Sequence, residues 1–206
     1  MCFSSKSSLY TLIIGIVASI LLIYYGNIKY AKENLIGGIF IMFVSIMQFF
    51  DYLFWNDLDN KKGTNKIGTL FAPLFNHLQP TFLYYLLCTI YNKFNILYFM
   101  LNLLYFIYVI IKYVQFISNS NNLITNVKYG HLYWKWKLNF NYIFYLLIFI
   151  FNIFIYIPLN YALLFFIICF SLLFISNKFY HNNMGEIWCY FASYSSLFLM
   201  FFSYFI

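Results

Sequence analysis

The sequence predicts an all-α fold, a polytopic transmembrane helix bundle with about seven spans. Of its 206 residues, 64% are hydrophobic and only 8% are charged, whereas a soluble domain carries roughly 25% charged residues. The mean hydropathy is +0.78, and the apolar residues recur in runs of about 20, the length that an α-helix needs to cross about 30 Å of hydrocarbon. We therefore exclude a soluble fold and expect the lipid bilayer to be the main partner of the chain.

The expected spans form a single transmembrane domain over residues 1–206. Each is an apolar run that polar or turn-forming residues close. In chain order they cover approximately residues 9–25, 34–55, 67–91, 95–117, 140–157, 160–176 and 184–206.

The first four spans have clear ends. Gly26 and Asn27 close the first span, and the polar segment NDLDNKKGTNK at 56–66 follows the second. The third span contains Pro73 and Pro80, each of which removes a backbone hydrogen bond from a helix. A short Asn-Lys-Phe turn then leads into the fourth span.

The longest connection, residues 118–139, joins the fourth span to the fifth. Its second half alternates aromatic residues with lysines. We expect this half to lie among the lipid headgroups, with Trp134 and Trp136 at the interface and Lys135 and Lys137 against anionic phosphates.

The last three spans follow each other closely. A tight turn at Pro158 joins the fifth span to the sixth, which ends near Ser176, and a short polar loop precedes the seventh. No charged residue holds the Pro158 turn outside the bilayer. The sequence therefore leaves open whether the fifth and sixth spans both cross fully.

The lysines predict that the N-terminus is cytoplasmic. All twelve basic residues are lysines, and lysines are enriched in cytoplasmic loops. On the N-terminal side of the predicted topology are Lys6, Lys61, Lys62, Lys66, Lys112, Lys128, Lys135, Lys137 and Lys178. On the other side are Lys29, Lys32 and Lys93. Because the lysines are scattered between apolar runs, the net charge of +7 does not indicate nucleic-acid binding.

A few polar and ionisable residues inside the expected spans form a candidate polar pocket. An ionisable group at the centre of a bilayer costs something like 2.5–3.5 kcal/mol on insertion scales, so each such group suggests a function. The candidates are Gln48, Asp51, Asn76, His77, Gln79 and Glu186. The predicted topology places Asp51 and Glu186 about one turn inside the same interface, with Asn76 and His77 deeper.

Simpler interpretations of these residues stay open. Asp51 and Glu186 are near enough to the predicted interface to reach water. Gln48 and Asn76 are typical of interhelical hydrogen bonds, and His77 of a core residue with satisfied hydrogen bonds. The four cysteines include no CxxC pair, and no spacing indicates a metal site. We therefore expect no metal and no cofactor.

Three segments, MQFFDYLFW, FNHLQP and MGEIWC, resemble uncharacterised multi-pass membrane proteins encoded by large DNA viruses. The shared pattern is Met-Gln followed by an acidic residue and Trp, then a Gln-Pro, then a Trp-Cys in the last helix. The matching positions are Met47, Gln48, Asp51, Trp55, Gln79, Pro80, Trp188 and Cys189. The resemblance covers three of the expected spans and implies a viral source but no activity.

Three functions fit these observations. The first is a small carrier or channel for protons, cations or a small solute, in which Asp51, Glu186 and His77 take part. The second is a structural or assembly protein of a viral or organellar membrane. The third is an intramembrane lipid-modifying enzyme, which we rank lowest because no His-x-x-His or Gly-x-Ser-x-Gly motif is present. The sequence indicates neither a catalytic residue nor an oligomeric state.

Overall fold

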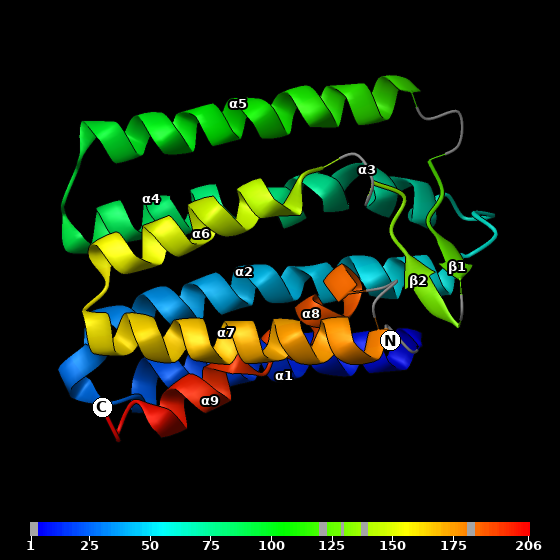
Figure 1. The fold of residues 1–206 in the computed structure, drawn as a ribbon. Coiled ribbons are helices and arrows are strands. Elements are labelled where there is room, and N and C mark those ends of the chain that lie inside the picture. Colours follow the sequence, from blue (N-terminus) through cyan, green and yellow to red (C-terminus); the bar gives the residue numbers. More distant parts are fainter. Residues whose placement is uncertain (1–3, 120–122, 129, 137–139, 181–183) are drawn as a thin grey trace.

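The computed structural model describes residues 4–119, 123–128, 130–136, 140–180 and 184–206. Most of these residues form helices that run side by side, and one short β-hairpin closes one end of the bundle (Figure 1). The elements are α1 (Ser5–Tyr25), the 3₁₀ helix η1 (Ile28–Tyr30), α2 (Ala31–Asn56), α3 (Thr64–His77), α4 (Gln79–Tyr91), α5 (Ile96–Asn119), β1 (Asn126–Lys128), β2 (His131–Tyr133), α6 (Tyr142–Tyr156), α7 (Leu159–Tyr180), α8 (Met184–Ala192) and α9 (Ser195–Phe202). We call the end with β1 and β2 the hairpin end, and the opposite end, with η1 and the C-terminus, the far end (Figure 1).

Four helical stretches in the described part of the chain are long and apolar enough to cross a membrane. They are Ser5–Tyr25, Ile28–Asn56, Ile96–Asn119 and Leu159–Phe179. This finding confirms the predicted helical bundle with several long apolar helices that could span a membrane. The prediction of seven spans is wrong, because the other three expected spans are not long continuous helices.

Each of these three segments lacks a long continuous helix for a physical reason. The expected span 67–91 is divided at Leu78, close to Pro80, whose missing N–H cannot continue the hydrogen bonding of α3. The expected span 140–157 contains only the 15 residues of α6, which at 1.5 Å per residue are shorter than about 30 Å of hydrocarbon. The expected span 184–206 is divided into α8 and α9, which end and begin at Ala192 and Ser195.

A short β-hairpin adds to the mostly helical fold a feature that the sequence analysis did not predict. Strands β1 and β2 pair antiparallel, with Val127 opposite Leu132, and Gly130 adopts a φ of +75° in the turn. Leu132 is completely buried, whereas Val127 is exposed. The hairpin therefore packs against the bundle through the Leu132 side chain of β2. Strands of only three residues are too short to be predicted from a hydrophobic pattern in the sequence.

Glycines bring α1 very close to its neighbours. A Cβ atom on Gly15 would lie 2.3 Å from Ser45 Oγ, and one on Gly38 would lie 2.9 Å from the carbonyl oxygen of Ser19. Real Cβ atoms do not approach other atoms so closely, so only glycine permits this separation of α1 and α2.

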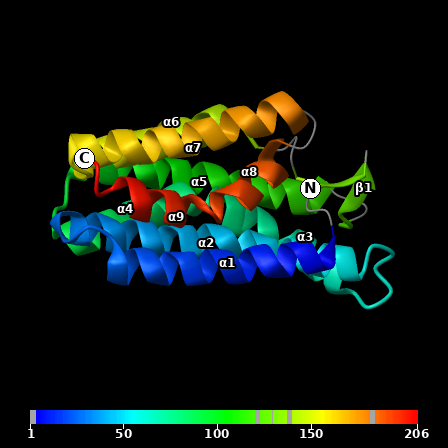
Figure 2. The ribbon, with the colours of Figure 1, turned by 90° about the horizontal axis from the view of Figure 1, so that it is seen from below.

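The broken helix α8–α9 lies between α7 and the α1–α2 pair (Figure 2). Two pairs of serine hydroxyls join α8–α9 to α1 and α2. Ser19 on α1 pairs with Ser196 at 2.9 Å, and Ser45 on α2 pairs with Ser193 at 3.1 Å. On the other side of the bundle, α5 is joined to α6 by reciprocal amide hydrogen bonds between Asn102 and Asn152, at 2.9 and 3.1 Å. The buried polar side chains on the long helices thus connect helices to one another.

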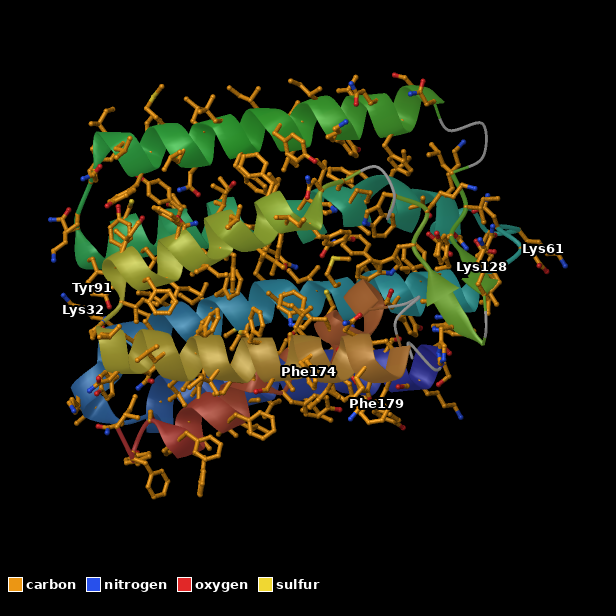
Figure 3. The ribbon with its side chains drawn as sticks, viewed as in Figure 1. Lys32, Lys61, Tyr91, Lys128, Phe174 and Phe179 are labelled. Atoms are coloured by element: carbon orange, nitrogen blue, oxygen red, sulfur yellow. The ribbon has the colours of Figure 1, made fainter. Side chains whose placement is uncertain are left out.

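Large apolar side chains cover the outside of the bundle. Phe174 and Phe179 on α7 are 63% and 66% exposed and point outward (Figure 3). A surface of this kind meets hydrocarbon more favourably than water.

Candidate functional site

Asp51 lies on α2, about one turn from the end of the helix, and its side chain is completely buried. The indole Nε1–H of Trp134 donates a hydrogen bond of 2.9 Å to Asp51 Oδ1. The side-chain amide of Gln48, one turn earlier on the same face, lies 3.5 Å from Oδ2. The carboxyl group therefore faces the interior of the bundle, not the lipid headgroups.

Trp134 and Trp136 lie in the interior, which corrects their expected location among the headgroups. Both indoles are completely buried, and their rings stack with centroids 5.0 Å apart. Lys135, in the turn between them, is exposed and faces outward. Lys137 lies outside the described residues.

A polar contact fixes the segment before the hairpin on α3. The Asn65 side chain donates to the carbonyl oxygen of Thr125 at 3.0 Å and accepts from its backbone N–H at 2.8 Å. The hydroxyls of Thr69 and Thr125 lie 2.9 Å apart. All three residues are buried, so the hairpin that carries Trp134 is anchored independently of Asp51.

Asp57 caps the start of α3 through the preceding loop. Its carboxylate accepts hydrogen bonds from the backbone of Lys62 at 3.0 Å and from the backbone and hydroxyl of Thr64 at 2.9 and 3.1 Å. Burial raises the pKa of this carboxyl, but these hydrogen bonds together with one from the Asn65 backbone outweigh it, so the pKa is lowered from its ordinary value of 3.8.

His77, the last residue of α3, lies in an aromatic environment. Its ring stacks on that of Phe140, with centroids 3.8 Å apart and an interplanar angle of 8°. The Tyr105 hydroxyl donates to the backbone carbonyl of His77 at 2.8 Å. The side chain is only 1% exposed, and its Nε2 atom has no hydrogen-bond partner among the described residues.

Asn76 and Gln79 flank the break between α3 and α4. The Cys189 thiol on α8 lies 3.9 Å from Asn76 Oδ1, and the Tyr145 hydroxyl on α6 donates to Gln79 Oε1 at 2.6 Å. Gln79 Nε2 and Gln48 Oε1 are buried, and nothing in the described part of the chain bonds to them. Gln79 Nε2 can therefore still donate two hydrogen bonds, and Gln48 Oε1 can still accept two.

The structure thus gathers most of the predicted pocket into one half of the bundle. Gln48 and Asp51 interact directly, while Asn76, His77 and Gln79 lie at the α3–α4 junction. The same hydrophobic cluster surrounds both groups and includes Met47, Phe50, Tyr105, Trp134, Phe140, Tyr145 and Cys189. The side chain of Glu186 lies outside the described part.

Four further residues contact the candidate residues, namely Trp134, Tyr105, Tyr145 and Cys189. The sequence analysis placed Trp134 among the headgroups and did not assign Cys189 to the pocket, and it named neither tyrosine. The sequence carries no signal that separates a buried Trp134 from a headgroup residue, because both suit a segment that alternates tryptophan with lysine. Within the described residues, no three His, Cys, Asp or Glu side chains lie together so that they could hold a metal ion.

Comparison of the chain with protein-family models, curated proteins and solved structures finds no match. Function must therefore be argued from the polar pocket and from the four candidate spans.

Proposed function

We propose that this membrane protein is a small carrier or channel for protons, cations or a small solute, with Asp51 as the charged group on the path. The observation that supports this proposal is the complete burial of Asp51 on a candidate span, where a Trp134 indole binds its carboxyl group. Burial of an ionisable group in a bilayer is costly, and such groups commonly take part in ion pathways and proton relays.

Buried polar atoms in the same half of the bundle support transport over a purely structural interior. Gln48 Oε1 beside Asp51, and His77 Nε2 and Gln79 Nε2 at the α3–α4 junction, are atoms for which the described residues offer no partner. In a bilayer such atoms are satisfied by water or by a bound solute. The break between α3 and α4 adds a second feature of carriers, which place binding sites at interrupted helices.

We further propose that the hairpin end faces the cytoplasm, as does the N-terminus. Lys61 and Lys128 lie at the hairpin end, and Lys32 lies at the far end (Figure 3). The excess of lysines on the side of Lys61 and Lys128 supports this orientation. In this arrangement the exposed Lys135 meets anionic phosphates of the inner leaflet.

A structural or assembly role in a viral or organellar membrane is the second candidate. The observation in its favour is that buried polar side chains pair across helices, as Asn102 does with Asn152 and Ser19 with Ser196. Such pairs contribute about 0.6 kcal/mol each on average. The likeness to membrane proteins of large DNA viruses belongs to this second proposal.

Proton and cation flux into liposomes that contain the purified protein separates the two candidates. The Asp51→Asn variant keeps the size of the side chain but not its charge. Asp59→Asn is the matched control, because the Asp59 side chain is 78% exposed in the loop after α2. Transport predicts flux in the natural protein and in the control, and strongly reduced flux in Asp51→Asn. Absence of flux in the natural protein and in both variants, in vesicles that contain folded protein, supports the structural role.

A further inference from the structure

A groove runs between α7 and the broken helix α8–α9 on the outside of the bundle. Leu172 and Ile175 line it from α7, and the residues that line it from α8–α9 include Tyr190, Tyr194 and Leu197. Figure 2 shows α8–α9 lying between α7 and α1 on this side of the molecule. The volume of the groove is about 490 Å³, within the roughly 300–1,000 Å³ of sites for small molecules. We call it the α7–α9 groove.

The α7–α9 groove is apolar and opens to the outside. Its lining atoms are almost all carbon. Ile175, Leu197 and Phe198 in its walls are exposed, and Phe174, the neighbour of Ile175 on α7, points outward (Figure 3). Water does not fill an apolar space of this kind, because it finds no hydrogen-bond partners there. In a bilayer the groove is therefore a place for an apolar chain.

The size of the groove distinguishes a lipid chain from a helix of a second protein. A helix with its side chains is at least about 10 Å across. A cylinder of that width with a volume of about 490 Å³ is only about 6 Å long, little more than one helical turn of about 5.4 Å. A helix would thus fit over a single turn, whereas an acyl chain is unbranched and much thinner. The volume favours the acyl chain over a second copy of the protein.

The groove lies at the depth of an acyl chain, near the hairpin end. Ile175 is five residues before the end of α7 at Tyr180, or about 7.5 Å along the helix axis. Tyr190 is six residues after the start of α8 at Met184, or about 9 Å along that axis. Because α7 is a candidate span and the hydrocarbon core is about 30 Å thick, the groove occupies the leaflet on the side of the hairpin.

A lysine follows the groove directly on α7. Leu172, Ile175 and Lys178 are spaced by three residues, so they form one row on the surface of the helix. Lys178 is exposed, and its Nζ atom lies 5.7 Å from the centroid of the Phe179 ring. No described side chain forms an ion pair with it. A lysine at the end of a span extends into the headgroup layer, where phosphate is the abundant anion.

We propose that the α7–α9 groove binds one acyl chain of a phospholipid, whose phosphate contacts the ammonium group of Lys178. The apolar walls match the chain, and the lysine at the hairpin end of the groove matches the phosphate. Both parts of the ligand thus have a counterpart in the row from Leu172 to Lys178. This lipid site goes beyond the proposed transport function and does not depend on it.

The experiment is native mass spectrometry of the purified protein in detergent, with two probe lipids added separately. The probes are a phosphatidylglycerol and a diacylglycerol with the same two acyl chains, so only the first carries a phosphate. Ile175→Trp and Leu197→Trp fill the groove from its two walls. Leu163→Trp is their control, because Leu163 also lies on α7 and is 42% exposed, against 38% for Ile175, but does not line the groove.

We expect one phosphatidylglycerol to stay bound to the natural protein and to the Leu163→Trp control. The bound fraction should fall strongly in both filling variants, because the indole takes the space of the acyl chain. Two filling variants, each compared only when it elutes as the natural protein does, separate this effect from misfolding.

Lys178→Gln should weaken the binding of phosphatidylglycerol about fivefold, since a lysine near an anionic lipid surface contributes about 1 kcal/mol. It should leave the binding of diacylglycerol unchanged. Lys61→Gln is the matched control and should bind both probes as the natural protein does, because Lys61 is 82% exposed in a loop at the same end of the molecule (Figure 3).

Three outcomes overturn the inference. Equal retention of lipid by the natural protein and by both filling variants places the lipid elsewhere on the surface. Equal affinity for the two probes, or no effect of Lys178→Gln, removes the phosphate from Lys178. A dimer without bound lipid, which Leu197→Trp converts into a monomer, assigns the groove to a second copy of the chain. None of these outcomes involves ion flux, so failure of the lipid site is distinguishable from failure of the proposed function.

Discussion

Trp134 and Trp136 allow the hydrogen bond to Asp51 to be tested by a matched pair of substitutions. Both indoles are completely buried and stacked on each other, but only Trp134 donates to Asp51. Trp136 Nε1 has no partner in the described part of the protein. Trp134→Phe and Trp136→Phe therefore remove similar ring area, and they differ in the loss of one buried hydrogen bond.

We expect Trp134→Phe to be the more destabilising change by about 1–3 kcal/mol, because it removes a buried hydrogen bond to a carboxyl group. Thermal unfolding in detergent micelles measures the difference as a lower Tm. Equal Tm values for the two variants would show that the indole N–H does not hold the hairpin on Asp51.

Asp57 makes the stability of the protein depend on acid pH. Its folded-state pKa is lowered from 3.8 because backbone and hydroxyl donors from Lys62, Thr64 and Asn65 outweigh the effect of burial. A group of this kind stabilises the folded state fully above 3.8, and the stabilisation is lost as the pH falls through the lowered folded-state pKa.

We therefore expect the Tm of the natural protein to exceed that of Asp57→Asn at neutral pH and the gap to close below about pH 4. Asp59→Asn, in an exposed loop position, should show no such gap. A gap that stays constant down to the lowest pH at which the protein folds would contradict the capping role of the Asp57 carboxylate.

Site residues were predictable where a polar or ionisable side chain interrupts an apolar run. Asp51 and Gln48 stand out because few ionisable or amide side chains interrupt the apolar runs, and three-residue spacing on a helix predicts that they meet. Trp134 was not predictable, because a segment that alternates Trp and Lys suits both a headgroup region and a buried edge. Tyr105 and Tyr145 were not predictable either, since aromatic residues are 26% of the chain and few of them touch the pocket.

The contact between α1 and α2 depends on glycines to different degrees. A Cβ on Gly15 would lie 2.3 Å from Ser45 Oγ, whereas a Cβ on Gly37 would meet no atom closer than 3.5 Å. Both glycines lie inside helices, where alanine is intrinsically favoured over glycine by about 0.8–1.0 kcal/mol.

We expect Gly37→Ala to be neutral or stabilising and Gly15→Ala to be destabilising by about 1–3 kcal/mol, as overpacking of a close interface requires. Tm values of the two variants in the same detergent check the prediction. A stable Gly15→Ala protein would mean that α1 can shift away from α2 and α8–α9 without loss.

The ends of the long helices were largely predictable from the sequence. The break between α3 and α4 was predictable only in part, and the break between α8 and α9 was not. The expected spans 9–25, 34–55, 95–117 and 160–176 agree with α1, α2, α5 and α7 to within a few residues, because polar and glycine residues close these apolar runs. Pro80 indicates a break in the third segment. No proline marks the interruption between α8 and α9, where Ser193 and Tyr194 stand among helix-compatible residues.

The sequence predicted seven spans and the structure has four candidate spans, because hydropathy depends on composition and does not show whether a helix is continuous. The segments of α3 with α4, α6, and α8 with α9 are apolar, and they pack beside the long helices. Their lengths, however, depend on hydrogen-bond breaks and on tertiary contacts that sequence averages cannot show. The arrangement of the whole bundle was therefore only partly accessible from the sequence.

Selective cysteine labelling tests the orientation of the whole molecule. Lys61 lies at the hairpin end with its side chain 82% exposed, and Lys93 is exposed in the turn between α4 and α5. If the hairpin end is cytoplasmic, a membrane-impermeant maleimide added to intact cells should label Lys93→Cys above the natural protein. It should label Lys61→Cys only after permeabilisation. The opposite pattern would reverse the proposed orientation.

The contacts between α1 and α9 also set the order in which the protein can be completed during synthesis. Ser19 and Ser196 are 177 residues apart, and Asn27 and Ser203 are 176 residues apart. When α1 and α2 leave the ribosome, they can pair at once, but their serine-lined side has no partner until the last helices arrive. The side of α1 that carries Ser19 therefore stays without its α9 contacts until those residues have been synthesised. Slow synthesis between α2 and α9 would prolong that intermediate and favour misassembly.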